Sequence, residues 1–353
     1  MSRSRDFADL AGSADAGGLT GRNLIINGAM QVAQRGTSST TTSLNSYATV
    51  DRFRTLITVA FGELVLTQEQ STDAPTGFAT SYKLTVSTPE TALAANELLR
   101  LEQRIEGQNL QHLKKGTSDA KAVTLSFWVK GSITGTYTIN ILDKDNLRTI
   151  AKSYTINSAN TWEYKTVTFA GDTSGALDND NADSLTVVWN LAAGTDRTSG
   201  TLATSWEANT AANLAVGQTD IVTTSGATWQ ITGVQLEVGE TATPFEHRSY
   251  GDELRRCQRY YYQSTDNNRY MSQGPVSTQA WEWIDLPVTM RAAPTGTVYG
   301  NQNEADVGKA QQDGGDKETL VLYQTQEVLG LLCSTSTSGQ NLQFWKIKVD
   351  AEL

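Results

Sequence analysis

Val123-Thr124-Leu125-Ser126-Phe127-Trp128-Val129-Lys130 is the stretch of sequence that decides the fold. Its aliphatic and phenylalanine side chains occupy every second position, which is the period of a β-strand with one buried face. The alternation returns in Tyr137, Ile139 and Ile141 after a turn region at residues 131–135. The two segments therefore predict an antiparallel hairpin.

Similar apolar patterns recur along residues 23–248. They predict a first strand in which Leu24 and Ile26 face the same way, and a late strand in which Gly233 marks a bulge that resets the alternation. The further strand candidates are residues 51–59, 82–86, 162–169, 184–189 and 228–236. We expect residues 23–248 to form an all-β, antiparallel, jelly-roll-like β-sandwich.

Two segments have helical character. Residues 96–113 are rich in helix formers, but Gly107 interrupts them and their middle part fits a strand equally well. Residues 249–261 predict a short connector helix, because Ser249 is a good N-cap and Asp252 follows three residues later.

Residues 262–353 return to strand patterns and predict a second, smaller β-domain. Residues 301–317 are rich in Asn, Gln, Asp and Gly, and they predict a long mobile loop in this domain. The expected strands are residues 280–286, 296–299, 319–323, 328–333 and 341–349.

Residues 1–22 form a leader whose second half is rich in Gly, Ala and Ser, which is typical of a linker. The leader lacks the apolar centre of a signal peptide. No apolar run in the chain approaches the roughly 20 residues of a membrane span. We therefore expect no membrane insertion, and a protein that is made in a cytoplasm and leaves it without secretion.

The composition argues against nucleic acid as a partner. Of 353 residues, 28 are Lys or Arg and 38 are Asp or Glu, so the formal net charge is −10. Such a charge repels phosphate backbones. Charged residues make up only 19% of the chain, below the roughly 25% of ordinary globular proteins. This balance suits exposed strands and turns.

The sequence contains no motif for catalysis, and we expect no enzyme, no cofactor and no metal. The only histidines are His112 and His247, and neither lies in a nucleophile, zinc or phosphate motif. We interpret His247 as a surface or inter-subunit hydrogen-bonding residue. Residues 178–183 offer several oxygen ligands for calcium, but they lack the other EF-hand positions and favour an Asx turn.

Two stretches resemble a known family. The opening NLIINGAMQVAQRG (residues 23–36), followed by YATVDRF (residues 47–53), resembles the start of a sandwich domain found in bacteriophage tail-fibre and related virion proteins. The stretch VQLEVGETATPFEHRSYGDELRRCQRYYY (residues 234–262) resembles the segment that closes this domain. The resemblance implies a lectin-like or carbohydrate-binding-module-like sandwich, assembled as a homotrimer on the virion.

The leader is also similar to fibre N-termini that dock to another virion protein. This resemblance is carried by SRSRDFADL (residues 2–10). It implies that Arg3, Arg5, Phe7 and Leu10 make the docking contacts.

Tryptophans are the leading candidates for ligand binding. Trp128 falls on the polar face of its strand, and Trp281 and Trp283 share one face of theirs. Flat rings stack on sugar faces and are also common in protein interfaces. The alternative is that these rings are buried in the sandwich or in a trimer seam.

These observations favour a tail fibre located on the virion. In this hypothesis the leader docks, residues 23–248 form a shaft or shoulder, and the C-terminal domain binds a host-surface glycan. One rival is a purely structural head fibre, decoration or adaptor protein. A second rival is a polysaccharide depolymerase, because two catalytic carboxylates leave no spacing signature. The chain shows no β-helix repeat of the kind such enzymes commonly have.

Overall fold

The computed structural model describes residues 21–41, 47–57, 61–264, 270–273, 279–300, 304, 307–312, 315–334 and 341–353. The chain divides into two compact units, Met1–Tyr250 and Gly251–Leu353. Each unit has its own hydrophobic core. Within the described ranges, no helix combines the length and hydrophobicity that crossing a membrane requires.

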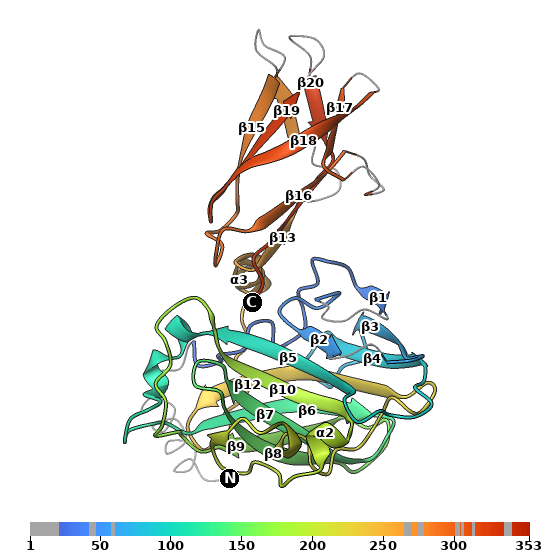
Figure 1. The fold of residues 1–353 in the computed structure, drawn as a ribbon, viewed down its shortest axis with the longest axis vertical. Coiled ribbons are helices and arrows are strands. Elements are labelled where there is room, and N and C mark those ends of the chain that lie inside the picture. The colour runs from blue at the N-terminus through green and yellow to red at the C-terminus, as the bar shows by residue number, and fades with distance from the viewer. Residues whose placement is uncertain are drawn as a thin grey trace. The chain divides into compact units, whose positions relative to one another are not determined.

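The first unit is an antiparallel β-sandwich (Figure 1). Its described residues form two six-stranded sheets. Sheet A has the order β1 (Ser38–Thr41), β3 (Val65–Ser71), β4 (Ser81–Thr88), β12 (Thr228–Val238), β6 (Val123–Gly131), β9 (Glu163–Phe169). Sheet B has the order β11 (Glu207–Ala208), β8 (Arg148–Ile156), β7 (Gly135–Asp143), β10 (Asp183–Ala193), β5 (Leu98–Glu106), β2 (Arg54–Ile57). The predicted all-β, jelly-roll-like fold is confirmed.

The core lies between the two sheets and follows the alternation of the sequence. Phe127 on β6 is fully buried, and its ring centroid lies 5.2 Å from that of Tyr154 on β8 and 6.0 Å from that of Trp189 on β10. These contacts join sheet A to sheet B, and such aromatic pairs each contribute about 0.5–1.5 kcal/mol beyond the burial of area. Trp128, the next residue along β6, therefore lies on the outer face of sheet A, where it is half-buried.

The predicted bulge at Gly233 is confirmed. Gly233 has a φ of 62°, and the register between β12 and β6 shifts between Thr232 and Gln235. The extra residue lets Ile231 and Val234 both face the core, where both are fully buried.

The opening segment differs from the prediction. Residues 23–28 are irregular, and Ile25 is fully buried whereas Leu24 and Ile26 are half-buried. The cause is local, because Asn23 Oδ1 accepts a hydrogen bond from Ile25 N and so holds the backbone in a turn. Leu24 N still donates to Leu236 O at 2.8 Å, so the segment stays attached to β12.

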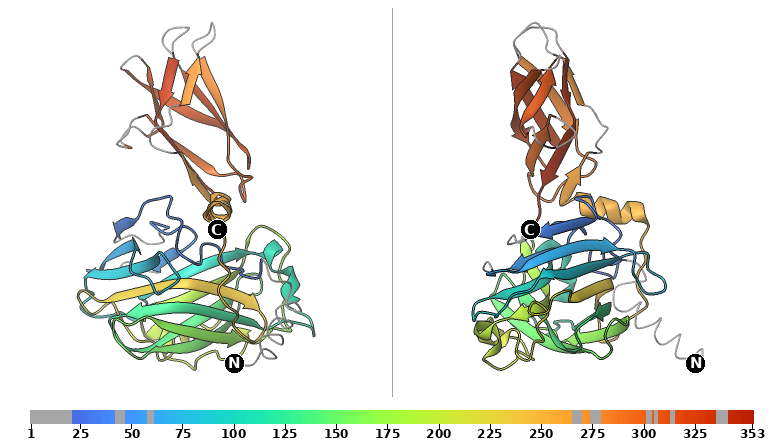
Figure 2. Two further views of the ribbon diagram at one scale, coloured as in Figure 1. Left: turned by 180° about the vertical axis from the view of Figure 1, so that it is seen from behind. Right: turned by 90° about the vertical axis from the view of Figure 1, so that its right-hand side faces the viewer.

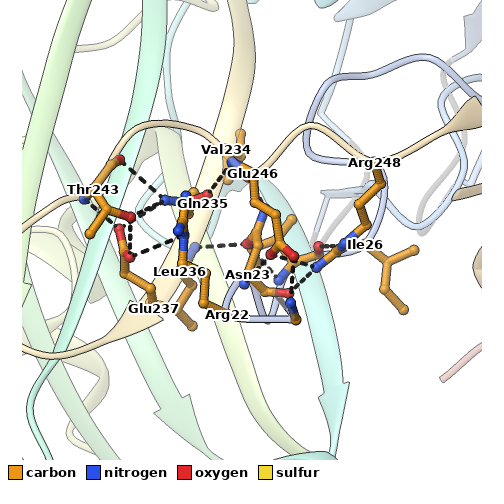
Figure 3. A network of polar contacts seen from close by, with 12 residues as sticks. Arg22, Asn23, Ile26, Val234, Gln235, Leu236, Glu237, Thr243, Glu246 and Arg248 are labelled. Atoms are coloured by element: carbon orange, nitrogen blue, oxygen red, sulfur yellow. Dashed lines mark hydrogen bonds and ion pairs between the residues drawn. The ribbon is translucent and has the colours of Figure 1, made fainter. Parts of the chain in front are cut away.

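The opening and closing segments meet in a network of hydrogen bonds (Figure 3). Asn23 Nδ2 donates to Val234 O at 3.1 Å, and Asn23 Oδ1 accepts from Leu236 N at 3.1 Å. Glu246 Oε2 accepts from Asn23 N at 2.8 Å. Arg248 Nη1 donates to Ile25 O at 3.1 Å. These hydrogen bonds hold residues 22–26 against residues 234–248, and we name this network the latch.

Residues 96–113 form a strand rather than a helix. Leu98–Glu106 is β5, and two short 3₁₀ turns follow it. The pairing explains this outcome, because β5 lies between β10 and β2 in sheet B. The short helical elements of the first unit are η1 (Gly107–Asn109), η2 (Gln111–Leu113), α2 (Thr195–Thr198) and η3 (Ala211–Asn213).

The second unit begins with helix α3 (Tyr250–Gln258), which lies within the predicted connector helix (Figure 2). In its described part, one sheet has the order β13 (Tyr261–Gln263), β21 (Lys346–Asp350), β16 (Thr295–Tyr299). The other has the order β14 (Tyr270–Gln273), β20 (Asn341–Phe344), β17 (Lys309–Gln312), β18 (Gly315–Gln324), β19 (Val328–Ser334), β15 (Gln279–Asp285). The prediction of a long loop at residues 301–317 was wrong in part, because β17 pairs antiparallel with the start of β18 there. These residues carry no strand signal in the sequence, since most of them are polar and do not alternate with apolar ones.

Candidate functional site

An aromatic pair lies on the outer face of sheet A. Trp128 of β6 stands directly opposite Tyr164 of β9 in the strand register. Their ring centroids are 5.4 Å apart with the planes tilted by 51°. Tyr164 is 46% exposed. Cross-strand neighbours on one face are the closest side chains in a sheet, so the register itself builds this pair.

The bulge at Gly233 extends the pair into a row. A Cβ at Gly233 would lie 2.6 Å from Phe78 Cζ and 3.1 Å from Trp128 Cδ1, so the glycine makes room for both rings. The ring of Phe78 packs edge-on against Phe245, with centroids 5.1 Å apart, and lies 5.3 Å from His247. We name Tyr164, Trp128, Phe78, Phe245 and His247 the aromatic row.

A polar cluster lies beside the row. Asp73 Oδ2 accepts hydrogen bonds from Lys130 Nζ at 2.6 Å and from Gln230 Nε2 at 3.3 Å, and Asp73 Oδ1 accepts from Trp162 Nε1 at 3.1 Å. The hydrogen bond from Lys130 holds the pKa of Asp73 below its usual range. Lys130 lies two residues after Trp128 and therefore on the same face of β6. We name these four residues the Asp73 cluster.

The row and the cluster together have the chemistry of a sugar-binding surface. Partly exposed rings offer flat apolar surface, and the neighbouring carboxylate, ammonium and amide groups offer the donors and acceptors that hydroxyl groups need. Binding sites combine a mostly apolar surface with a few polar groups that fix orientation in this way.

The structure brings Trp128 together with residues that the sequence analysis missed. Tyr164 had a usable signal, because it alternates with the buried Val167 and Phe169 at the opposite phase of its predicted strand. Phe78 and Phe245 had none, since both come from irregular segments that reach Trp128 only through the fold.

Trp283 in the second unit is a separate exposed indole. It is 54% exposed on β15, directly opposite Gly330 of β19. A Cβ at Gly330 would lie 2.8 Å from Trp283 Cζ3, so the indole rests on the glycine backbone. Trp281 belongs to the same strand, but its side chain lies outside the described residues. The predicted docking residues Arg3, Arg5, Phe7 and Leu10 lie outside them too.

Residues 178–183 and the two histidines, which the sequence analysis considered for metal binding or catalysis, make structural contacts. Asp180 Oδ1 accepts from Ala182 N at 2.9 Å, which is the hydrogen bond of an Asx turn. Across the described ranges, no three His, Cys, Asp or Glu side chains gather as metal ligands would. The His247 ring packs against Phe78 and Phe245, and burial lowers the pKa of His112.

Asp220, which is not part of the aromatic row, has a raised pKa. Burial, and then the charge of Glu97, raise its pKa from 3.8 to about 6. Because this folded-state pKa lies above the ordinary value, the folded chain loses stability as pH rises through the window from 3.8 to about 6. At neutral pH, Asp220 is ionised in the folded chain, and the whole loss of stability is present.

We therefore expect Asp220→Asn to raise the melting temperature at pH 7 by a few degrees and to leave it nearly unchanged at pH 4. Thermal denaturation at both pH values measures this difference. Asp119→Asn is the matched control, because the Asp119 side chain is 71% exposed. An equal shift at both pH values would contradict the explanation.

Comparisons with known proteins place the chain among distant structural likenesses. No family model and no curated protein matches it. It is similar to the enzymatically active domain of tailspike protein 4 of bacteriophage CBA120, with 14% identity, a TM-score of 0.32 and coverage of 62% of this chain and 21% of that one. The chain thus spans about a fifth of that protein.

Two carbohydrate-binding modules are also similar. A family 11 module from Clostridium thermocellum, in complex with a β-1,3-1,4-mixed-linked tetrasaccharide, is 10% identical, with a TM-score of 0.30 and coverage of 60% of this chain and 98% of that one. TmCBM61, in complex with β-1,4-galactotriose, is 7% identical, with a TM-score of 0.31 and coverage of 62% and 99%. At TM-scores this low, the likenesses assign no function to this chain.

Proposed function

We propose that this chain is a non-catalytic component of a bacteriophage virion that attaches the particle to a host-surface glycan through the aromatic row. One observation supports the proposal: the exposed ring of Tyr164 and the half-buried rings of Trp128, Phe78 and Phe245 gather around the Gly233 bulge of sheet A, beside the Asp73 cluster. Aromatic rings that keep part of their surface in water can stack on the apolar face of a sugar, and their polar edges suit an interface.

The main glycan contact thus lies on residues 23–248, whereas the sequence analysis assigned it to the C-terminal domain; the other assignments are those that the sequence suggests. Residues 1–22 dock to another virion protein, and three copies assemble as a homotrimer on an external projection such as a tail fibre. The Trp283 indole gives each copy a second stacking surface. Repeated copies act together, so that each single contact with a repetitive polysaccharide needs only modest affinity.

Binding of the purified chain to polysaccharides from candidate host cells tests the proposal. Trp128→Ala and Tyr164→Ala should each weaken binding by about fivefold to tenfold, because a stacked ring contributes roughly 1–1.5 kcal/mol. Tyr250→Ala is the matched control, since Tyr250 is 57% exposed but lies at the start of α3. Full binding by both row variants, with their melting temperatures unchanged, would refute the proposed site.

Two further measurements separate the rivals. Antibodies that label the capsid and leave the tail bare would favour a structural head fibre, decoration or adaptor protein. Release of reducing ends from a bound polysaccharide would show a depolymerase.

A further inference from the structure

A cluster of arginines lies on sheet B. Of the residues that the structure describes, three arginines converge on the fully buried carboxylate of Glu102. Arg54 Nη1 and Arg104 Nε lie 3.0 and 3.1 Å from Glu102 Oε1. Arg100 Nη2 lies 2.9 Å from Oε2, in a contact with the geometry of an ion pair rather than a hydrogen bond.

The strand register builds this cluster on the outer face of sheet B. Arg54 of β2 stands directly opposite Glu102 of β5. Arg100 and Arg104 lie two residues before and after Glu102, so all four side chains share one face. The intervening Leu101 faces the core, where it is fully buried. The cluster therefore lies on a different sheet from the aromatic row.

Positive charge exceeds negative charge in the cluster. Although burial raises it, the pKa of Glu102 is held below its usual range by the neighbouring guanidinium groups. Asp183 is the second carboxylate, with Oδ2 3.5 Å from Arg104 Nε, and burial raises its pKa. Even with both carboxylates ionised, one positive charge is left over, in a chain whose net charge is −10.

The arginines have more donors than Glu102 can use. Each guanidinium carries five N–H donors, and each of these three places one nitrogen on Glu102. The buried Nε of Arg100 has no hydrogen-bond partner within the described ranges. An unmet buried donor costs free energy, so the donors that Glu102 leaves unused favour a further acceptor at this place. The three side chains remain 13–20% exposed and can be reached from solvent.

An aromatic ring borders the cluster. Arg54 Cζ lies 6.0 Å from the ring centroid of Tyr47, and Arg35 Cζ lies 5.5 Å from the same centroid. The cluster thus combines guanidinium groups with an adjacent ring, which suits a sugar that carries a negative group.

We propose that Arg54, Arg100 and Arg104 form a binding site for an oxyanion carried by a glycan, either a sugar carboxylate or a sugar phosphate. Guanidinium groups bind both through paired N–H donors. This site is distinct from the aromatic row, and it gives the chain a preference for acidic over neutral polysaccharides.

Calorimetric titration of the full chain at low salt tests the site. The probes are an oligogalacturonide, a phosphorylated oligosaccharide, inorganic phosphate and a neutral oligosaccharide of matched length. We expect saturable binding of at least one acidic glycan, weakened by added salt, and no binding of the neutral one. Equal binding of neutral and acidic glycans, or binding of inorganic phosphate alone, would overturn the proposal.

Variants locate the binding. Arg100→Gln and Arg104→Gln should weaken binding of the acidic glycan at least about tenfold. Arg100→Lys keeps the charge beside Glu102, so it keeps the fold and still loses the paired donors. Lys83→Gln is the matched control, because Lys83 forms a surface pair with Glu69 on sheet A. Undiminished binding by Arg100→Lys at an unchanged melting temperature would refute the site.

Trp128→Ala separates this inference from the proposed function. It should leave binding of the acidic probes unchanged, whether or not the aromatic row binds a host glycan. Loss of acidic binding in Trp128→Ala would place the acidic ligand on sheet A and overturn the inference.

Discussion

Replacing Lys115 with methionine is expected to lower the free energy of unfolding by about 3–5 kcal/mol. The Lys115 side chain is 5% exposed, and its Nζ lies 2.5 Å from Asp143 Oδ2 and 3.0 Å from Asp172 Oδ2. The same ammonium donates to the carbonyl oxygens of Ser174 and Gly175 at 3.0 and 2.8 Å. Lysine thus fills an oxygen-lined cage much as a bound cation would.

The expected loss comes from the carboxylates that remain. Asp143 and Asp172 are almost fully buried, with side chains 0% and 4% exposed. Arg148 still pairs with Asp172 at 2.7 Å, so the uncompensated charge falls mainly on Asp143. Removing one partner of a buried ion pair costs far more than removing a surface pair.

Chemical denaturation of Lys115→Met and of Lys83→Met measures the difference. Lys83→Met is the control. It should change the free energy of unfolding by less than about 1 kcal/mol, because the Lys83 and Glu69 side chains are 29% and 35% exposed. Similar losses in the two variants would show that the cage contributes no more than a surface pair.

Gly28→Ala is expected to lower the free energy of unfolding by about 3 kcal/mol or to prevent folding. A Cβ at Gly28 would lie 2.1 Å from the backbone oxygen of Val234. The two backbones touch because Gly28 O accepts a hydrogen bond from Val234 N at 2.9 Å. No side-chain rotation relieves the clash, because the contact is with backbone. Either β12 or the opening segment must move, and that movement breaks the hydrogen bonds between Asn23 and β12 that Figure 3 shows.

Gly62→Ala is the matched control for this prediction. A Cβ there would lie 3.6 and 3.7 Å from the carboxylate oxygens of Glu90, which is ordinary contact. Denaturant titration of both variants should show a large loss for Gly28→Ala and almost none for Gly62→Ala. Equal stability of the two would mean that the close approach of the segments is not needed for closure.

Much of the fold was predictable where one face of a strand is buried. Strands β6 and β7 were predictable because their core-facing apolar residues recur at every second position, although the polar residues between them are largely buried as well. The bulge at Gly233 was predictable because the apolar residues before and after it fall at opposite phases of the strand alternation. β5 remained ambiguous, since its leucines and charged residues fit helical spacing as well as a strand. Pairing with β2 and β10, which no local pattern reveals, decides the matter.

The candidate site was predictable only in part. Trp128 was predictable as a surface ring because it falls at the polar phase of a strand whose other phase is apolar. Its partners Phe78 and Phe245 are 167 residues apart in sequence, and they meet through the bulge and the closing latch. The arginine cluster depends in the same way on the register of two strands separated by some 40 residues. Long-range contacts of this kind have no signature in a single sequence.

Indole resonances in a proton–nitrogen NMR spectrum test the central claim most directly. Titration with a polysaccharide that the chain binds should shift the Trp128 indole signal, while the fully buried Trp189 and Trp229 signals stay in place. A saturating polysaccharide that leaves the Trp128 signal unmoved would contradict glycan attachment through the aromatic row.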